Sequence, residues 1–269
     1  MTFCAVCKAA GTRVETITLE IFLVLSAAGV LAGAVNAIAG GGTFFSFPVL
    51  VWAGLPPLVA NTTNMVALMP AYGAALPPLR NELKSLGRVM IVPVIAGTIG
   101  GLVGALLLLY FGDAVFESAV PYLIGFATLL FALAPTMRSW VTRWGSNSGG
   151  ESQVWTATLI FGFSIYGGYF GAGIGQILLA ALILVGFDNL RAANALKNVI
   201  SFAISVISVL VFALSGTVAW KFAFILMISA TIGGYLGGML SARAPLAAMR
   251  TGIIIFGCCL TAYYFYASF

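Results

Sequence analysis

Two glycine clusters that interrupt apolar segments are the first residues in this chain whose type and spacing could do chemistry. With their polar neighbours they are Asn36, Gly40, Gly41, Gly42 and Thr43 in the first half of the chain, and Gly171, Gly173, Gly175 and Gln176 in the second. Glycine destabilises a continuous helix, so such clusters are typical of places where the backbone bends or approaches something closely. A helix that restarts after the bend directs unpaired N–H groups and the positive end of its dipole into the gap, which favours an anion. Matching breaks in two halves therefore predict a transport site, with close packing of small residues as the alternative.

A second set of polar residues occupies the next apolar segment of each half. These are Asn61, Thr62 and Asn64 in the first half, and Asn194, Lys197 and Asn198 in the second. Spacings of three and four residues put side chains of a set on one helix face. Unpaired polar groups are costly in hydrocarbon, so we expect these side chains to face protein or a wet cavity. Lys197 could neutralise an anionic substrate there; the alternative is an interfacial lysine that extends to the membrane surface.

The glycine clusters and these polar sets together are the predicted substrate-binding site, and other kinds of chemistry lack their residues. The chain has no His, and its acidic residues fall at or near the ends of apolar segments, which disfavours a buried proton relay or a cation carrier. Cys4 and Cys7 provide only half of a zinc site, without a second pair. No nucleophile is accompanied by a base. We therefore expect no catalytic residues, no metal ion and no cofactor, and a carrier of a small anion rather than an enzyme.

The composition places this chemistry in a membrane. Hydrophobic residues make up 61% of the 269 residues and charged residues only 7%, whereas soluble domains have about 25% charged residues. The mean hydropathy is +1.10. These values exclude a soluble enzyme, a nucleic-acid-binding protein and a secreted disulfide scaffold. The net charge of +5 comes from basic residues in short loops, where they orient membrane proteins. The lipid bilayer is the expected partner besides the substrate, and the oligomeric state stays open, with a homodimer as one option.

The apolar segments predict an all-α polytopic membrane protein, since about 20 residues suffice for each crossing. The eight long segments are 17–39, 58–79, 89–111, 114–134, 154–170, 192–214, 222–242 and 247–266. Two short segments, 43–53 and 176–185, each follow a glycine cluster and are expected to form short broken or re-entrant helices. The predicted parts of the chain are an N-terminal tail (1–15), a first transmembrane repeat (16–135), a cytoplasmic linker (136–152) and a second transmembrane repeat (153–269).

The two repeats match at a constant offset of 133 residues, which carries Gly40 onto Gly173 and Asn61 onto Asn194. A register that holds this far indicates internal duplication, a common feature of transporters. Parallel repeats follow if the short segments are re-entrant, and inverted repeats follow if they cross. The basic loop changes place between the halves, from 80–88 to 243–250. Because positive loops stay cytoplasmic, we favour inverted repeats, at the cost of an exported basic tail.

Glycines four residues apart recur in the later segments, and here close helix packing is the favoured interpretation. The pairs are Gly97 with Gly101, Gly100 with Gly104, Gly233 with Gly237 and Gly234 with Gly238.

The site motifs resemble the sulfite exporter TauE/SafE family of membrane transporters. In the first half the resemblance rests on Ala-Gly-Gly-Gly-Thr at 39–43, Gly-Leu-Pro-Pro at 54–57 and Val-Ala-Asn-Thr-Thr-Asn at 59–64. It recurs in the second half as Gly-Ala-Gly-Ile-Gly-Gln at 171–176 and Arg-Ala-Ala-Asn-Ala-Leu-Lys-Asn at 191–198. The resemblance implies a secondary transporter for sulfite, an organosulfonate or another small anion, mostly described as export across the bacterial inner membrane.

Three alternatives remain open from the sequence. One is an uptake permease for a related sulfur or carboxylate anion, because gradients rather than residues set the direction of flux. Another is an anion channel, which turnover and counter-transport would separate from a carrier. A third is a membrane-embedded enzyme or assembly factor, which would need a reactive constellation that the chain lacks.

Overall fold

The structure is a computed structural model that describes residues 17–144, 153–187, 189–240 and 246–267, with backbone alone for 134–144, 246–248 and 267. The predicted tail with Cys4 and Cys7, and residues 145–152 of the predicted linker, lie outside this part. Every regular element within it is a helix. The helices are α2 (Leu19–Ile38), α3 (Thr43–Trp52), α4 (Pro57–Ala74), η1 (Pro77–Leu79), α5 (Arg80–Leu86), η2 (Gly87–Met90), α6 (Ile91–Trp144), α7 (Gln153–Tyr169), α8 (Ile174–Leu184), α9 (Leu190–Ser215), α10 (Trp220–Leu240) and α11 (Leu246–Ala267).

Each predicted apolar segment contains a helix, and the two short segments are the short helices α3 and α8. Two segments predicted on either side of residue 112 form one element, α6, in which Gly112 is non-helical, with φ 73° and ψ −170°. Glycine takes this backbone without the steric cost that a Cβ imposes. Helix α6 is therefore two segments joined at a turn, 91–111 and 113–144, and the second extends into the predicted linker.

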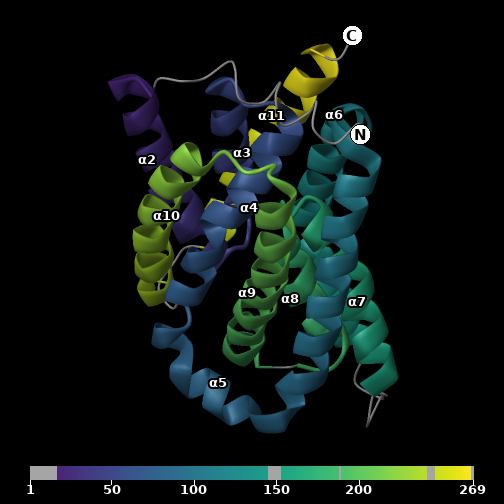
Figure 1. Cartoon of the computed structure of the whole chain (residues 1–269). Helices are drawn as coiled ribbons and strands as arrows, with labels where there is room; N and C mark the ends of the chain where they lie inside the picture. The colour runs from purple at the N-terminus through teal and green to yellow at the C-terminus, as the bar shows by residue number, and fades with distance from the viewer. Residues whose placement is uncertain (1–16, 145–152, 188, 241–245, 268–269) are drawn as a thin grey trace.

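The helices run between two ends of the molecule (Figure 1). In this view α5 crosses the lower end, between α4 and the start of α6, whereas the last turns of α11 lie at the upper end. Helices α2 and α10 lie side by side on the left, and α7 lies on the right. The two ends give the frame in which the direction of every helix can be read.

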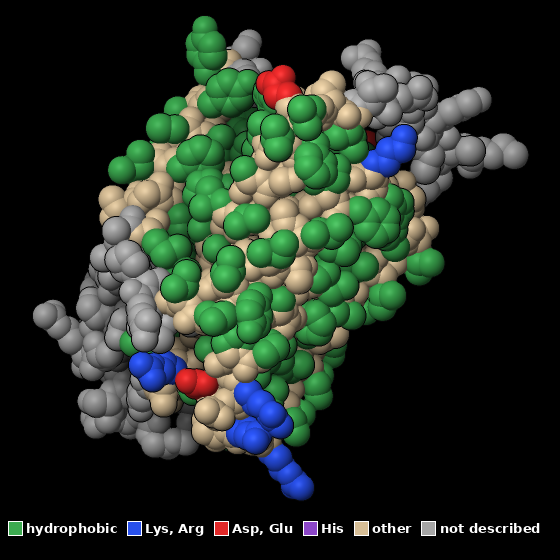
Figure 2. Space-filling view, turned by 90° about the vertical axis from the view of Figure 1, so that its left-hand side faces the viewer, with side chains coloured by type: hydrophobic (Ala, Val, Ile, Leu, Met, Phe, Trp, Pro, Cys, Tyr) green, Lys and Arg blue, Asp and Glu red, His purple; other side chains and the backbone are tan. Residues whose placement is uncertain are grey.

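The flank of the molecule is apolar and the ends are polar. Figure 2 shows hydrophobic side chains over the flank, with Lys and Arg gathered mainly at the lower end. Exposed Arg80, Lys84 and Arg88 come from α5 and η2. Four helical stretches among the described residues are long and apolar enough to cross a membrane: Leu19–Ile38, Pro77–Leu133, Leu190–Ser215 and Trp220–Leu240. An apolar flank between polar ends is the surface of a membrane protein.

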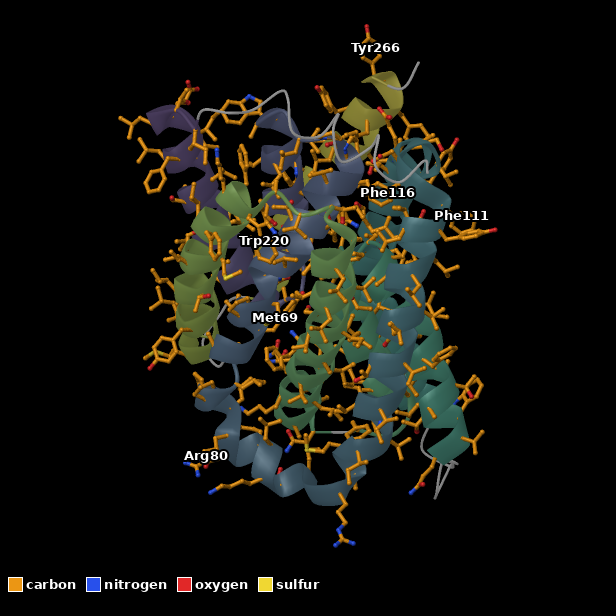
Figure 3. All side chains as sticks on the ribbon, in the orientation of Figure 1. Met69, Arg80, Phe111, Phe116, Trp220 and Tyr266 are labelled. Carbon is orange, nitrogen blue, oxygen red and sulfur yellow. The ribbon has the colours of Figure 1, made fainter. Side chains whose placement is uncertain are left out.

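Labelled residues in Figure 3 fix the direction of the chain. Arg80, which begins α5, lies at the lower end, and Phe111, which ends the first segment of α6, lies in the upper part. That segment therefore ascends, and α4 before it descends. Trp220, which begins α10, lies in the upper part, and Tyr266 of α11 lies at the upper end. Helix α10 therefore descends and α11 ascends.

Helices α2 and α7 each fold back with the short helix that follows. A Cβ on Gly42, just before α3, would lie 2.1 Å from the carbonyl O of Ala32 in α2. A Cβ on Gly167 of α7 would lie 2.9 Å from the side chain of Ile174, which begins α8. Each long helix and its short partner thus form a hairpin whose tip is a glycine cluster.

The two hairpins open at opposite ends of the molecule. Helix α4 descends, so the α2–α3 hairpin that leads into it opens at the upper end. Helix α9 begins beside the lower end, since Leu86 of α5 and Met90 of η2 pack with the cluster that contains Ala193 and Leu196. The α7–α8 hairpin that leads into α9 therefore opens at the lower end.

This arrangement alters the relation between re-entrant helices and repeat orientation that the sequence analysis assumed. There, α2 and α7 were expected to run the full distance, so that re-entrant short helices would leave parallel repeats. Instead each long helix turns back with its short partner. Three through-going segments then remain in each half: α4 and both segments of α6, then α9, α10 and α11. The length of an apolar segment indicates what it can span, whereas the buried glycine turn decides where it reverses.

Small residues bring helices of the two halves into backbone contact. A Cβ on Gly233 of α10 would lie 2.0 Å from the carbonyl O of Val30 in α2. A Cβ on Gly104 of α6 would lie 2.0 Å from the carbonyl O of Ile165 in α7. These distances leave no room for a side chain, so the prediction of close packing at the later glycines is confirmed. Both contacts join the first half of the chain to the second, and together they hold the hairpins in place.

Candidate functional site

The two glycine clusters lie against each other in the interior. A Cβ on Gly40 would lie 2.4 Å from the Cα of Gly175, and a Cβ on Gly175 would lie 2.5 Å from the Cα of Gly40. Residues 39–43 and 170–175 are buried throughout. Gly40 (φ 76°) and Gly173 (φ 74°) take the left-handed conformation, which lets one helix end and the next begin in a new direction. The hairpins therefore meet at their tips, backbone against backbone.

Side chains close the first tip and tie it to the second. The Oδ1 atom of Asn36 accepts a hydrogen bond from the N–H of Gly42 at 2.7 Å, which fixes the turn between α2 and α3. The Nε2 atom of Gln176, in the first turn of α8, donates to the carbonyl O of Ala39. A polar residue beside each glycine cluster thus has a defined structural partner at the tips.

Helix α4 contributes two amides that reach both hairpins. The Nδ2 atom of Asn61 donates to the carbonyl O of Tyr169, at the end of α7, at 3.0 Å. The Nδ2 atom of Asn64 donates to the Oγ1 atom of Thr43, at the start of α3, at 3.3 Å. Both asparagines are fully buried. Helix α4 therefore holds the tips in register through neutral hydrogen bonds.

Thr62 lies on α4 but faces away from the hairpin tips. Its Oγ1 atom donates to the carbonyl O of Thr217 at 2.7 Å. The Oγ1 atom of the adjacent Thr63 accepts from the N–H of Ala219 at 2.9 Å. These two bonds hold α4 against the turn between α9 and α10. The structure thus separates Thr62 from the other predicted site residues of its helix.

Lys197 of α9 is buried where the tips meet. Only 1% of its surface is exposed, which excludes the alternative of an interfacial lysine that extends to the surface. A Cβ on Gly175 would lie 3.4 Å from the Cδ atom of Lys197, and the Nζ atom donates to the carbonyl O of Asn36 at 3.4 Å. Within the described part of the chain, no acidic side chain pairs with it. A lone, long contact to a carbonyl leaves most of the hydrogen-bonding capacity of an ammonium unused.

Several buried polar atoms of the hairpins, α4 and α9 have no hydrogen-bond partner among the described residues. They are Asn36 Nδ2, Asn61 Oδ1, Asn64 Oδ1, Asn194 Oδ1, both amide atoms of Asn198, and the hydroxyls of Ser164, Ser201 and Ser208. Leaving such an atom unpaired costs about 1–3 kcal/mol, so a cluster of them marks a place suited to a polar ligand. The amide of Asn198 and the hydroxyl of Ser201 can both donate to an anion, and both lie within one helical turn of Lys197.

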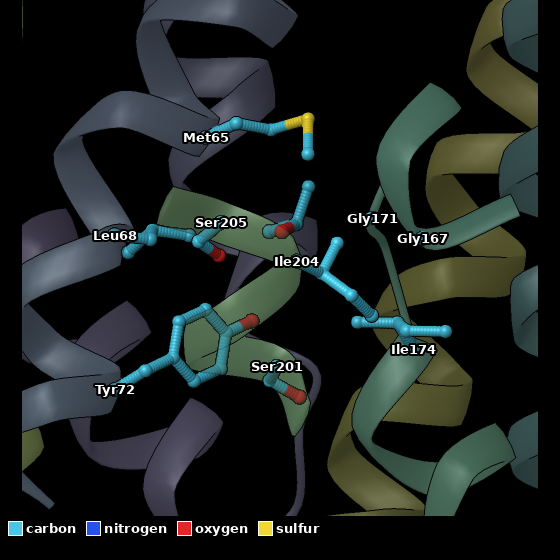
Figure 4. A pocket seen from close by; sticks show the side chains of 10 residues that line it. Met65, Leu68, Tyr72, Gly167, Gly171, Ile174, Ser201, Ile204 and Ser205 are labelled. Carbon is cyan, nitrogen blue, oxygen red and sulfur yellow. The ribbon is translucent and has the colours of Figure 1, made fainter. Parts of the chain in front are cut away.

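A pocket between α4, α9 and the second hairpin adjoins this cluster (Figure 4). Its volume is about 300 Å³, open mouth included. Its apolar side chains are Met65, Leu68, Ile174 and Ile204, and its hydroxyl-bearing side chains are Thr43, Tyr72, Ser201 and Ser205. Figure 4 shows Tyr72 extending from α4 toward Ser201 and Ser205 on α9. The arrangement offers an apolar chamber with neutral hydrogen-bonding groups.

The sequence analysis missed these pocket residues, although a signal for them was present. Ser201, Ser205 and Ser208 follow Asn198 at spacings of three and four residues, so one polar stripe runs along an otherwise apolar helix. Single serines are common in membrane helices, and only the sum of the stripe is informative. Phe131 was missed without any such signal: it is fully buried, and its ring lies next to Gly41, where a Cβ would be 2.8 Å from its Cζ atom.

Comparison with known proteins gives a consistent assignment. The model of the sulfite exporter TauE/SafE family matches residues 25–264. The chain is 30% identical over 255 residues to a "Probable membrane transporter protein" of Haemophilus influenzae, covering 91% of this chain and 95% of that protein. It is 28% identical over 247 residues to the "Probable membrane transporter protein YfcA" of Escherichia coli, covering 88% of this chain and 87% of that protein. With its apolar flank and helical architecture, the chain belongs to the sulfite exporter TauE/SafE family of membrane transporters.

Proposed function

We propose that this protein is a secondary transporter of a small anion, and that the anion binds where the hairpin tips meet. Lys197 carries the proposal, as a buried cation with no acidic partner among the described residues. A buried charge is stable only when it is paired and hydrogen-bonded. An anion at this place supplies the missing pair, and donors from Asn198 and Ser201 complete its coordination.

We propose inverted repeats around this site. The offset of 133 residues between the halves and the opposite openings of the two hairpins support inversion. The lower end, with Arg80, Lys84 and Arg88, is then cytoplasmic by the positive-inside rule, as is the linker 136–152. In this arrangement three segments of each half cross the membrane and each hairpin enters from one side, in place of eight long crossings. Substrate access would alternate as one repeat rocks against the other around the tips.

Sulfite or an organosulfonate is the proposed substrate, and export across the bacterial inner membrane is the proposed direction. The family description, which reads sulfite exporter, supports the substrate. Bacterial relatives named as membrane transporters support the location. Sulfite and sulfonate each carry three oxygens that accept hydrogen bonds at one charged centre, which suits an ammonium surrounded by amide and hydroxyl donors.

Lys197→Gln tests the proposal. We expect it to weaken sulfite binding by about ten- to a hundredfold, the equivalent of about 1–3 kcal/mol for a charge-assisted hydrogen bond. Binding is measured by calorimetry on purified protein, and flux by sulfite entry into proteoliposomes, with protein-free vesicles as the blank. Lys84→Gln is the matched control, because Lys84 is exposed on α5. Equal affinity and flux in the two variants would rule out an anion site at Lys197.

A further inference from the structure

We propose that the pocket between α4 and α9 is a second subsite, which receives the uncharged tail of an organic anion whose charged group binds at Lys197. The inference rests on the proposed function and deepens it. It makes a short-chain organic sulfonate a better ligand than inorganic sulfite, and a zwitterion of the same size a poor one.

The pocket and the cation share walls on three elements. Thr43 lines the pocket and accepts the hydrogen bond from Asn64. Ser201 lines it from α9, one helical turn after Lys197. Ile174 lines it immediately before Gly175, against which the Lys197 stem lies. A ligand whose charged group contacts Lys197 therefore has the pocket as its nearest free space.

The lining of the pocket suits a neutral, partly apolar group. Met65, Leu68 and Ile204 offer aliphatic and thioether surface from α4 and α9. The hydroxyl of Ser201 is buried without a protein partner among the described residues, so it can donate to a sulfonate oxygen or bond to a substituent on the tail. With a volume of about 300 Å³ that includes the mouth, the pocket admits only a short chain.

A positively charged tail has no partner in this pocket. The side chains described as lining it include no carboxylate, and the charged side chain beside it is Lys197 itself. An ammonium there would be removed from water without compensation and would repel that lysine. The geometry thus discriminates between two tails of similar size, a methyl group and an ammonium group.

Three probes separate the two subsites. Sulfite carries the charged group alone, 1-propanesulfonate adds an apolar tail, and taurine is nearly isosteric with 1-propanesulfonate but ends in an ammonium. We expect 1-propanesulfonate to bind at least about tenfold more tightly than sulfite, from burial of its methylenes. We expect it to exceed taurine by a similar or larger factor, because the ammonium is left unpaired. Calorimetry on the purified full-length protein measures all three.

Two variants change the pocket in opposite directions. Ser205→Leu fills it and should weaken 1-propanesulfonate at least about tenfold while leaving sulfite unchanged, since about three methylenes lose their space. Met65→Ala enlarges it and should shift the preference toward 1-pentanesulfonate. Ala203→Leu is the matched control, because Ala203 lies on the same helix but outside the pocket.

The outcomes separate this inference from the proposed function. Taurine binding as tightly as 1-propanesulfonate would overturn the inference. So would an equal loss of sulfite and 1-propanesulfonate binding in Ser205→Leu together with an unchanged chain-length preference in Met65→Ala. In either case, a Lys197→Gln variant that still loses sulfite binding leaves the anion site intact. If none of the anions binds, the proposed function falls and the tail subsite falls with it.

Discussion

Helices α4 and α9 occupy corresponding places in the two halves but use their polar residues differently. Asn64 and Lys197 match at the offset of 133 residues. Asn64 bonds to Thr43 in the hairpin of its own half, whereas Lys197 reaches the carbonyl of Asn36 in the hairpin of the other half. On α4 the side chains of Asn61, Thr62 and Thr63 also have protein partners, at the second hairpin and at the turn before α10.

On α9 the balance is reversed. The polar stripe from Asn194 through Asn198 and Ser201 to Ser208 keeps atoms without a protein partner among the described residues. The difference teaches that the duplicated framework assigns unequal work to matching helices. Helix α4 uses its polar groups to hold the tips, and α9 presents its polar groups to a ligand. Three predictions test this contrast, beginning with the tips on which both helices depend.

The largest effect is expected from Gly175→Leu. The new side chain would begin 2.5 Å from the Cα of Gly40, and because that neighbour is backbone it cannot move aside. We expect transport to be abolished, since the hairpins can no longer meet and neither α4 nor α9 can then complete the site. Sulfite flux in proteoliposomes, normalised to the protein inserted, is the measurement.

Gly162→Leu is the control for this variant. Gly162 lies on α7, in the same hairpin, and a Cβ there would meet nothing within 4 Å. We expect it to transport normally. Normal transport by Gly175→Leu as well would show that contact between the tips is dispensable, and the contrast between α4 and α9 would lose its common foundation.

An exchange of the two matching residues should give the next largest effect. In the double variant Asn64→Lys with Lys197→Asn, the charge moves to α4, where its predecessor bonds to Thr43. We expect sulfite affinity to remain about ten- to a hundredfold below the parent, no better than Lys197→Asn alone, because the position on α4 faces its own hairpin. Recovery of parental affinity by the double variant would mean that the halves are interchangeable and would contradict the contrast.

The smallest effects should separate affinity from stability. Asn198→Ala removes an amide without a protein partner, so it should weaken sulfite binding by about three- to tenfold and leave thermal stability almost unchanged. Thr62→Val leaves the carbonyl of Thr217 without its donor, so it should cost about 1 kcal/mol of stability with affinity unchanged. Calorimetry and thermal unfolding in detergent give the two quantities. A reversed pattern would assign the holding role to α9.

Much of the helical framework could be predicted because it depends on local properties of the chain. Apolar runs place every helix, the glycine clusters mark both tips, and the break near residue 112 coincides with the positive φ of Gly112. The burial of Lys197 could not be predicted, since the same spacing suits a lysine that extends to the surface. Only tertiary packing, which puts Gly175 and Asn36 beside it, decides between the two.

The parts that escaped prediction depend on contacts between distant segments. The length of α2 and α7 gives no sign that either reverses inside the molecule, because 20 apolar residues can equally cross it. Thr62 shares its motif with Asn61 and Asn64 yet bonds to the turn before α10. The pocket around Tyr72 and Ser205 exists only where α4 meets α9. None of these is encoded in a window short enough to be read along the chain.

The contact between Gly40 and Gly175 has a genetic consequence. At most core positions a larger residue can be accommodated when its neighbour becomes smaller, so harmful substitutions have suppressors. Here each neighbour is already the smallest residue, and the atoms in contact are backbone. No second-site change at either position can restore the space that a side chain at the other would occupy. A suppressor screen started from Gly175→Leu should therefore return true revertants or substitutions that displace a whole hairpin.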